Sequence, residues 1–117
     1  MIICRKFKFD AAHYLPLHKG KCQKLHGHTW HVEVAICGKE LTDGMLMDFA
    51  ELKEIAYNKV ISLYDHQCLN DFYETPTAEN LALTLRRLIN LGLPEGITVH
   101  FIRVWESDDS YAQVGGE

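Results

Sequence analysis

The sequence predicts an α+β domain in which an antiparallel four-stranded sheet carries two helices on one face. Apolar residues alternate with polar ones near the N-terminus and again from His28, whereas two later segments repeat apolar residues at helical spacing. Two more strand-like segments follow, so the order along the chain is ββααββ. Strands that follow one another in sequence favour antiparallel pairing, with the helices collected on one side of the sheet.

The first two strands are identified by strict alternation. Residues 6–10 place Phe7 and Phe9 on the same face. The alternation that starts at His28 is the clearest strand in the sequence, and its apolar face consists of Trp30, Val32, Val34 and Ile36. Residues 12–27, which lie between the two strands, are expected to form a loop.

Two helices begin at recognisable N-terminal caps. Asp48 followed by Glu51 is a capping signal, and Thr77 caps a second helix that should end at Gly92. The apolar residues at helical spacing are Phe49, Leu52, Ile55, Ala56, Val60 and Leu63 in the first helix and Leu81, Leu85 and Leu88 in the second. Residues 65–76 between the helices are expected to form a polar loop.

The last part of the chain predicts two more strands. Residues 97–105 are apolar on both faces of an extended segment, and residues 110–114 are expected to pair back as a short hairpin. A domain this small has no further layer to cover the second apolar face. We therefore expect copies of the chain to associate.

Length and composition bound the class of protein. The 117 residues are expected to form a single domain, 1–117, and 47% hydrophobic with 24% charged residues is typical of a globular chain. No apolar run approaches the roughly 20 residues that cross a bilayer, and the N-terminus lacks a secretory pattern. The four cysteines show no close pairing, so we expect reduced thiols in a cytoplasmic protein without membrane partners.

The net charge of −4 conceals an asymmetry. Residues 1–32 contain six basic side chains and one acidic one, whereas the remainder of the chain is strongly acidic. An acidic chain argues against a nucleic-acid partner. The basic segment would suit a small anionic substrate beside an active site, or it is simply a solvated stretch.

Three histidines are candidates for a metal site. His26 and His28 are two residues apart on an extended segment, so their side chains point the same way with Cα atoms about 6.5 Å apart. His13 follows the neighbouring strand and can reach this pair, whereas His31 has the opposite parity and points away. Catalytic Zn²⁺ typically takes three protein ligands and keeps a fourth position open. The alternative is a set of incidental surface histidines.

Cys22 lies four residues before His26, in the same loop. It could be a fourth ligand that closes a structural metal site, a buried inert thiol, or a nucleophile or base held beside the metal. A nearby cation, together with Lys21 and Lys24, would lower the pKa of its thiol.

Two further polar features, Asp65 with His66 and the single carboxylate Glu106, are candidates for a functional role. Asp65 next to His66 could orient the imidazole and give a proton donor near neutral pH, or His66 is merely a residue at a helix C-terminus. Glu106 ends a strongly apolar strand, where its carboxylate needs donors. A ligand with adjacent ring N–H and amino groups would satisfy it, and exposure to water is the alternative.

Together these residues resemble the 6-pyruvoyltetrahydropterin synthase / 6-carboxytetrahydropterin synthase family over nearly the whole chain. The resemblance rests on six blocks in the right order, which are Phe9–His13, Cys22–His28, Gly44–Lys53, Asp65–His66 with Leu69–Asn70, Pro76–Asn80 and Val104–Glu106. It implies a tunnelling fold (T-fold), whose sheets join between subunits into a barrel, usually in a hexamer.

The resemblance also implies roles for individual residues. By position, His13, His26 and His28 are similar to the zinc ligands of the family. Cys22 corresponds to its general base, and Asp65 with His66 to its proton-transferring pair. Glu106 corresponds to the carboxylate that anchors the pterin ring, with Thr77 and Glu79 near it. In this family the pockets lie between subunits, so Cys22 and His66 need not come from one chain.

The implied activity is that of a zinc-dependent lyase. The three-residue gap between Cys22 and His26 resembles the bacterial 6-carboxy enzymes, which convert 7,8-dihydroneopterin triphosphate to 6-carboxy-5,6,7,8-tetrahydropterin, acetaldehyde and triphosphate for 7-deazaguanine (queuosine) precursors. Lys19, Lys21 and Lys24 are candidates for the triphosphate by charge alone. The alternatives are a 6-pyruvoyltetrahydropterin synthase that stops after triphosphate elimination, a zinc hydrolase, and a non-catalytic module with structural zinc.

Overall fold

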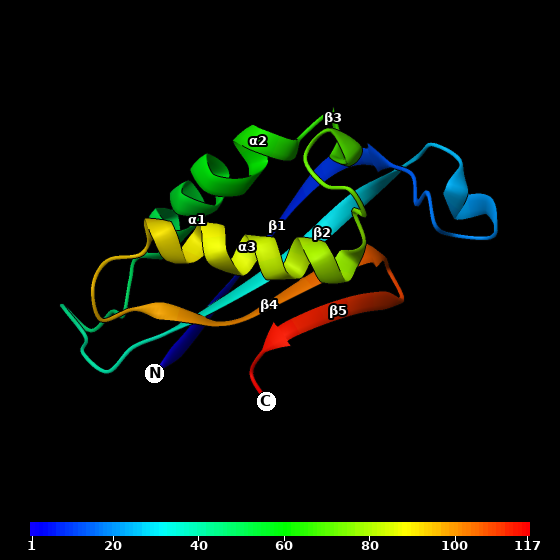
Figure 1. The fold of residues 1–117 in the computed structure, drawn as a ribbon. Coiled ribbons are helices and arrows are strands. Elements are labelled where there is room, and N and C mark those ends of the chain that lie inside the picture. Colours follow the sequence, from blue (N-terminus) through cyan, green and yellow to red (C-terminus); the bar gives the residue numbers. More distant parts are fainter.

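The computed structural model describes residues 1–117, and its centre is one twisted sheet with helices on a single face (Figure 1). The strand order across the sheet is β3-β1-β2-β4-β5. β1 (Ile2–His13) and β2 (His26–Cys37) pair antiparallel along their whole length. β4 (Thr98–Ser107) pairs with β2, and β5 (Ser110–Gly115) completes the predicted C-terminal hairpin. The α+β class and the ββααββ order are thus confirmed.

The helices start at the predicted caps. The Asp48 carboxylate accepts the N–H of Ala50 at 2.8 Å, and α1 (Phe49–Ala56) follows. The helix continues through a π-helical turn (Tyr57–Ile61) into α2 (Ser62–Tyr64). The Thr77 hydroxyl accepts the N–H of Asn80 at the start of α3 (Ala78–Gly92). None of these helices has the length and apolar character needed to span a bilayer.

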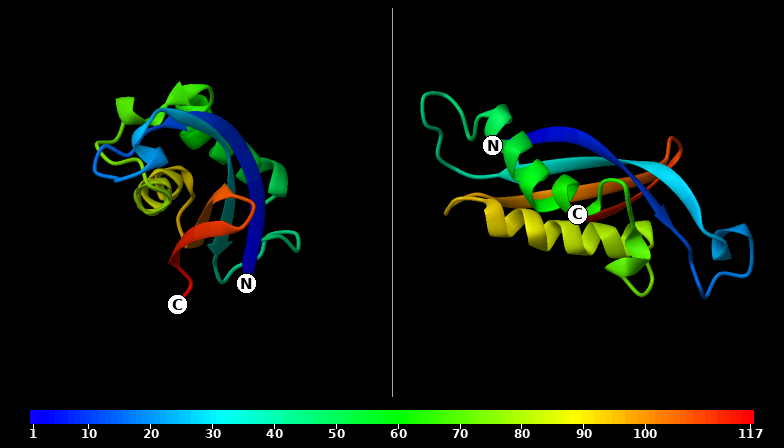
Figure 2. Two further views of the ribbon diagram at one scale, coloured as in Figure 1. Left: turned by 90° about the vertical axis from the view of Figure 1, so that its right-hand side faces the viewer. Right: turned by 90° about the horizontal axis from the view of Figure 1, so that it is seen from above.

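The core lies between the sheet and the helices. Figure 2 shows the sheet curling around α3, which packs against β4 and β5. The predicted apolar face of β2 is fully buried, and α3 buries Ile89 while Leu88 is only half-buried. Phe49 and Leu63 of the first helix are exposed, although their spacing is helical. The other fully buried side chains include Leu52, Val60, Leu81, Leu85, Ile102 and Val104.

The predicted four-stranded antiparallel sheet is wrong in one respect, because a fifth strand makes the sheet mixed. β3 (Gln67–Cys68) pairs parallel with Ala11 and Ala12 at the outer edge of β1. A two-residue strand is too short for a period-2 pattern, so a polar loop was expected here. The strands around the first loop are also longer than predicted, because β1 continues to His13 and β2 begins at His26.

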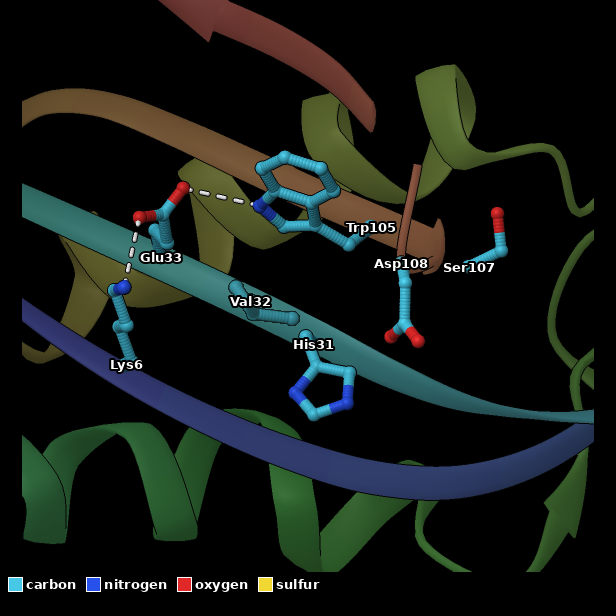
Figure 3. A pocket seen from close by; sticks show the side chains of 7 residues that line it. All are labelled: Lys6, His31, Val32, Glu33, Trp105, Ser107 and Asp108. Atoms are coloured by element: carbon cyan, nitrogen blue, oxygen red, sulfur yellow. Dashed lines mark hydrogen bonds and ion pairs between the residues drawn. The ribbon is translucent and has the colours of Figure 1, made fainter. Parts of the chain in front are cut away.

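The second face of the sheet is less apolar than the pattern of β4 indicated. The Glu33 carboxylate accepts the indole N–H of Trp105 at 3.0 Å and lies 3.7 Å from the Lys6 ammonium, beside a hollow of about 220 Å³ (Figure 3). The Arg103 guanidinium covers the Phe101 ring at 4.5 Å. We expected a second copy of the chain to cover this face. Long polar side chains of the same chain provide part of that cover.

Candidate metal centre and its surroundings

The structure brings His13, His26 and His28 together on the helix-facing side of the sheet. Residues His13 and His26 are directly opposite each other in the β1–β2 ladder, and His28 lies two residues further along β2 on the same face. The ring centroids are 4.6 Å apart for His13 and His26, 5.1 Å for His13 and His28, and 4.8 Å for His26 and His28. The His13 side chain is completely buried, and the other two rings are partly accessible.

Hydrogen bonds to carbonyl groups determine which ring nitrogens carry protons. His13 Nδ1 lies 2.8 Å from the Pro76 carbonyl oxygen, and His26 Nδ1 lies 2.7 Å from that of Lys24. Because a carbonyl oxygen only accepts, both Nδ1 atoms are donors, and in the neutral rings both Nε2 atoms therefore carry lone pairs. These two Nε2 atoms are 3.0 Å apart. Two facing lone pairs repel unless a cation lies between them, so the donor set fits a metal ion.

Glu106 completes the cluster. One of its carboxylate oxygens lies 3.1 Å from His13 Nε2 and 3.4 Å from His28 Nε2. These four residues each offer one ligand atom, and the four atoms lie within 4.8 Å of one another. Glu106 sits where the pairing of β4 with β5 shifts register, and such a bulge redirects a side chain. Sequence reasoning placed Glu106 at a strand end but did not place it against the histidines.

His28 shows most clearly that protein atoms alone leave the cluster incomplete. Its Nε2 atom is buried and makes no hydrogen bond, although Glu106 is close enough for an ion pair. A buried polar atom without a partner typically costs about 1–3 kcal/mol. Burial lowers the pKa of His28, against the opposing effect of the Glu106 carboxylate, so the neutral, metal-binding form is favoured.

The Asp65–His66 pair lies outside this cluster. Asp65 accepts from His66 Nδ1 at 3.1 Å and from the Asp10 N–H at 3.0 Å, and these two bonds hold the pKa of its carboxyl below the ordinary value, the Asp10 bond most strongly. The His66 side chain is 78% exposed. It borders an open hollow of about 580 Å³ whose lining also includes Gly27 and Thr29. His28 also lines this hollow, so the hollow borders both His66 and one of the clustered histidines.

Cys22 is not part of the cluster either. It lies in a 3₁₀ turn (Lys21–Gln23) within the loop that extends beyond the sheet between β1 and β2 (Figure 1). Its carbonyl oxygen accepts the N–H of Leu15 at 2.7 Å, and its thiol is free. The structure therefore groups Glu106 rather than Cys22 with the three histidines.

Of the two residues expected near a substrate, Glu79 lies beside Glu106. Glu79 is exposed in the first turn of α3, and it lines a hollow of about 370 Å³ together with Glu106 and Tyr111. Thr77, one residue before α3, has its hydroxyl engaged as the helix cap. This hollow reaches the metal cluster through the Glu106 side chain, because Glu106 belongs to both.

The similarity to known proteins extends over nearly the whole chain. The family model described as 6-pyruvoyl tetrahydropterin synthase matches residues 2–117. The chain belongs to this family. Among solved structures, the 6-pyruvoyl tetrahydropterin synthase of Caenorhabditis elegans superposes with a TM-score of 0.86 at 24% identity, covering 100% of this chain and 96% of the other. That similarity establishes the predicted T-fold.

Two relatives show the range of activities attached to the family. A protein of Archaeoglobus fulgidus, provisionally named a 6-carboxy-5,6,7,8-tetrahydropterin synthase, is 44% identical over 114 residues, which are 97% of this chain and 95% of that protein. The dihydroneopterin monophosphate aldolase of Pyrococcus furiosus is 35% identical over 107 residues, which are 92% and 90%. Pterin chemistry on a small molecule is therefore the function class of this family member.

Proposed function

We propose that this protein is a zinc-dependent 6-carboxy-5,6,7,8-tetrahydropterin synthase. It would convert 7,8-dihydroneopterin triphosphate and water to 6-carboxy-5,6,7,8-tetrahydropterin, acetaldehyde and triphosphate, in the cytoplasmic synthesis of 7-deazaguanine (queuosine) precursors. The observation that carries the proposal is the cluster of His13, His26 and His28, whose facing acceptor atoms need a cation. The identity to relatives named for this activity supports the choice of substrate.

The three histidines would hold Zn²⁺ through their Nε2 atoms. When bound, zinc supplies a Lewis acid for the substrate's side-chain hydroxyls. The carbonyl groups of Pro76 and Lys24 fix the tautomers of His13 and His26, so both ligands are oriented before metal arrives. His28 is the ligand whose Nε2 makes no hydrogen bond to the protein.

Glu106 would anchor the pterin ring at the entrance to the metal centre. Its carboxylate borders the hollow that also contains Glu79, and a carboxylate suits the adjacent ring N–H and amino donors of a pterin. Glu79 borders the same hollow, and Thr77 caps the helix that carries Glu79. On this proposal, Glu106 turns from the metal cluster toward the ring when substrate binds.

Proton transfers are assigned to Cys22 and to the Asp65–His66 pair. The Cys22 thiolate would remove a proton from the substrate side chain, and His66, oriented by Asp65, would return one. Triphosphate leaves by elimination, and water then takes part in cleaving a carbon–carbon bond, which releases two carbons as acetaldehyde. Within one chain, neither Cys22 nor the Asp65–His66 pair belongs to the histidine cluster. This supports a site shared between subunits of a homo-oligomeric barrel, for which we propose a hexamer.

The decisive experiment supplies purified, zinc-loaded protein with 7,8-dihydroneopterin triphosphate and identifies the products by mass. We expect 6-carboxytetrahydropterin with one acetaldehyde per turnover. A tetrahydropterin product without acetaldehyde would instead indicate a 6-pyruvoyl synthase. The variant Cys22→Ala, with zinc retention verified, should be inactive, because full activity there would favour a zinc hydrolase. Zinc spectroscopy with sulfur in the first coordination shell would favour a structural-zinc module.

The aldolase relative provides a second candidate. The Pyrococcus furiosus protein is named for dihydroneopterin monophosphate, and an aldol cleavage leaves the phosphate on the departing two-carbon fragment. Presenting the monophosphate and the triphosphate in parallel separates the two functions. Release of inorganic triphosphate supports the synthase, whereas a phosphorylated aldehyde from the monophosphate supports the aldolase.

A further inference from the structure

The main chain of Asp10 holds the Asp65–His66 pair in place from the edge of β1. The Asp10 N–H donates to Asp65 Oδ1 at 3.0 Å, and the Asp10 carbonyl oxygen accepts the His66 N–H at 2.6 Å. Both main-chain groups of Asp10 are thus used on the outer side of β1, away from its partner Thr29 in β2. In an antiparallel ladder this orientation marks a non-hydrogen-bonded pair, whose side chains are close together.

The side chain of Asp10 is fixed as well. The Thr29 hydroxyl donates to Asp10 Oδ1 across the strand pair. The carboxylate held in this way contributes an oxygen that lies within 4.8 Å of both an Asp65 oxygen and a His66 ring nitrogen. Two carboxylates from different elements therefore flank one imidazole.

His66 depends on these contacts for its orientation. Its main chain has a positive φ of 62°, a strained conformation that a residue with a side chain keeps only when its surroundings impose it. Its ring is 78% exposed, so packing does not immobilise it. His66 is held instead by the bonds that it donates, from its main-chain N–H to the Asp10 carbonyl oxygen and from its Nδ1 to the Asp65 carboxylate.

We propose that Asp10, tethered by Thr29, is a positioning residue for the proton-transferring pair Asp65–His66. This inference rests on the proposed function, in which His66 carries a proton to the substrate. While the ring carries that proton it is cationic, and a second carboxylate within 4.8 Å stabilises it and limits its rotation. On this proposal Asp10 acts through His66 and not on the substrate directly, so its loss should change the rate of the proton-transfer step rather than substrate affinity.

The test compares Asp10→Ala, Asp10→Asn, Thr29→Val and Thr29→Ser with wild type. Alanine removes charge and tether, asparagine keeps the tether alone, and valine keeps the shape of Thr29 without its hydroxyl. We expect kcat to fall about tenfold or more in Asp10→Ala, less in Asp10→Asn and Thr29→Val, and to recover in Thr29→Ser, with KM unchanged throughout. Asp43→Asn removes an equal charge from a turn at the opposite end of β2 and serves as the control, because it should leave kcat unchanged.

A double-mutant cycle with His66→Ala separates this proposal from the function on which it rests. Single turnovers with excess enzyme should show that Asp10→Ala has no further effect once His66 is absent. Equal losses in both backgrounds, or wild-type kcat in Asp10→Ala beside an inactive His66→Ala, would overturn the positioning role alone. Full activity of His66→Ala would instead refute the proposed role of His66. Zinc content and the unfolding midpoint are measured for every variant. A loss of kcat supports the proposal when both match those of the wild type. A loss of kcat that is accompanied by a matching loss of zinc or of stability overturns it.

Discussion

Replacement of His13 by alanine is expected to abolish metal binding and also to destabilise the metal-free protein. His13 differs from the other two clustered histidines because its side chain is completely buried. Its ring packs edge-on against Trp30 at 5.0 Å, and its Nδ1 donates to the Pro76 carbonyl at 2.8 Å. The residue therefore connects β1, β2 and the segment before α3 whether or not metal is present.

The magnitude follows from what alanine leaves behind. Truncating a buried side chain of this size leaves a cavity, and such changes cost about 2–5 kcal/mol. The Pro76 carbonyl loses its partner, which adds about 1 kcal/mol. Removing His13 Nε2 also relieves its repulsion with His26 and Glu106, which offsets part of this cost. We expect a net loss of about 2–4 kcal/mol in the metal-free state.

The matched control is His26→Ala. Its ring is only partly buried, and its bond to the Lys24 carbonyl is local and exposed, so the metal-free protein should lose about 1 kcal/mol or less. Both variants should lose zinc in elemental analysis. Urea unfolding of chelator-treated proteins compares the two, at one protein concentration so that the proposed association would contribute equally to both. Stoichiometric zinc in His13→Ala, or equal stability of the two metal-free variants, would refute the reasoning.

Three other outcomes are expected. Glu106→Gln should retain zinc but raise KM about tenfold or more in steady-state kinetics, because a neutral amide forms a weaker bond to ring donors than a carboxylate does. The pKa of His28 is lowered in the folded chain, so as the pH falls the unfolded chain binds its proton first, near pH 6.5. The stability of the metal-free protein should therefore decrease as the pH falls from 6.5 toward the lowered pKa. Denaturation measured at a series of pH values checks this. Gly27→Ala should leave stability unchanged or raise it by up to about 1 kcal/mol in the same denaturation assay, because an added Cβ meets no atom within 4 Å.

The sequence predicted the strands and the histidine cluster for related reasons. The β1–β2 ladder runs without a bulge from Ile2 opposite Cys37 to His13 opposite His26. In an uninterrupted ladder, parity alone determines which side chains share a face, so the convergence of three imidazoles could be expected from spacing. The helix caps at Asp48 and Thr77 were equally accessible, because a cap depends on a few neighbouring residues.

Other features could not be predicted because they depend on contacts that are distant in sequence. Glu106 reaches the histidines through a register shift between β4 and β5, and no local pattern encodes that shift. β3 forms where residues after the first helix meet the free edge of β1, at Ala11 and Ala12. The positive φ of His66 could not be predicted either, because the residue is not a glycine. Its conformation is imposed by bonds to Asp10.

The directions of the donor and acceptor atoms explain why the cluster suits a cation and not an anion. Trp30 packs edge-on against His13 and His28, yet its indole N–H donates to the Ala11 carbonyl rather than to the cluster. The Nδ1 protons of His13 and His26 also point away, toward main-chain carbonyl groups. Acceptor atoms are thus directed inward and donors outward, with the Glu106 carboxylate adding negative charge. An anion entering this site would meet only lone pairs. A divalent cation would satisfy all of them at once, including the buried Nε2 of His28, which makes no hydrogen bond within the protein.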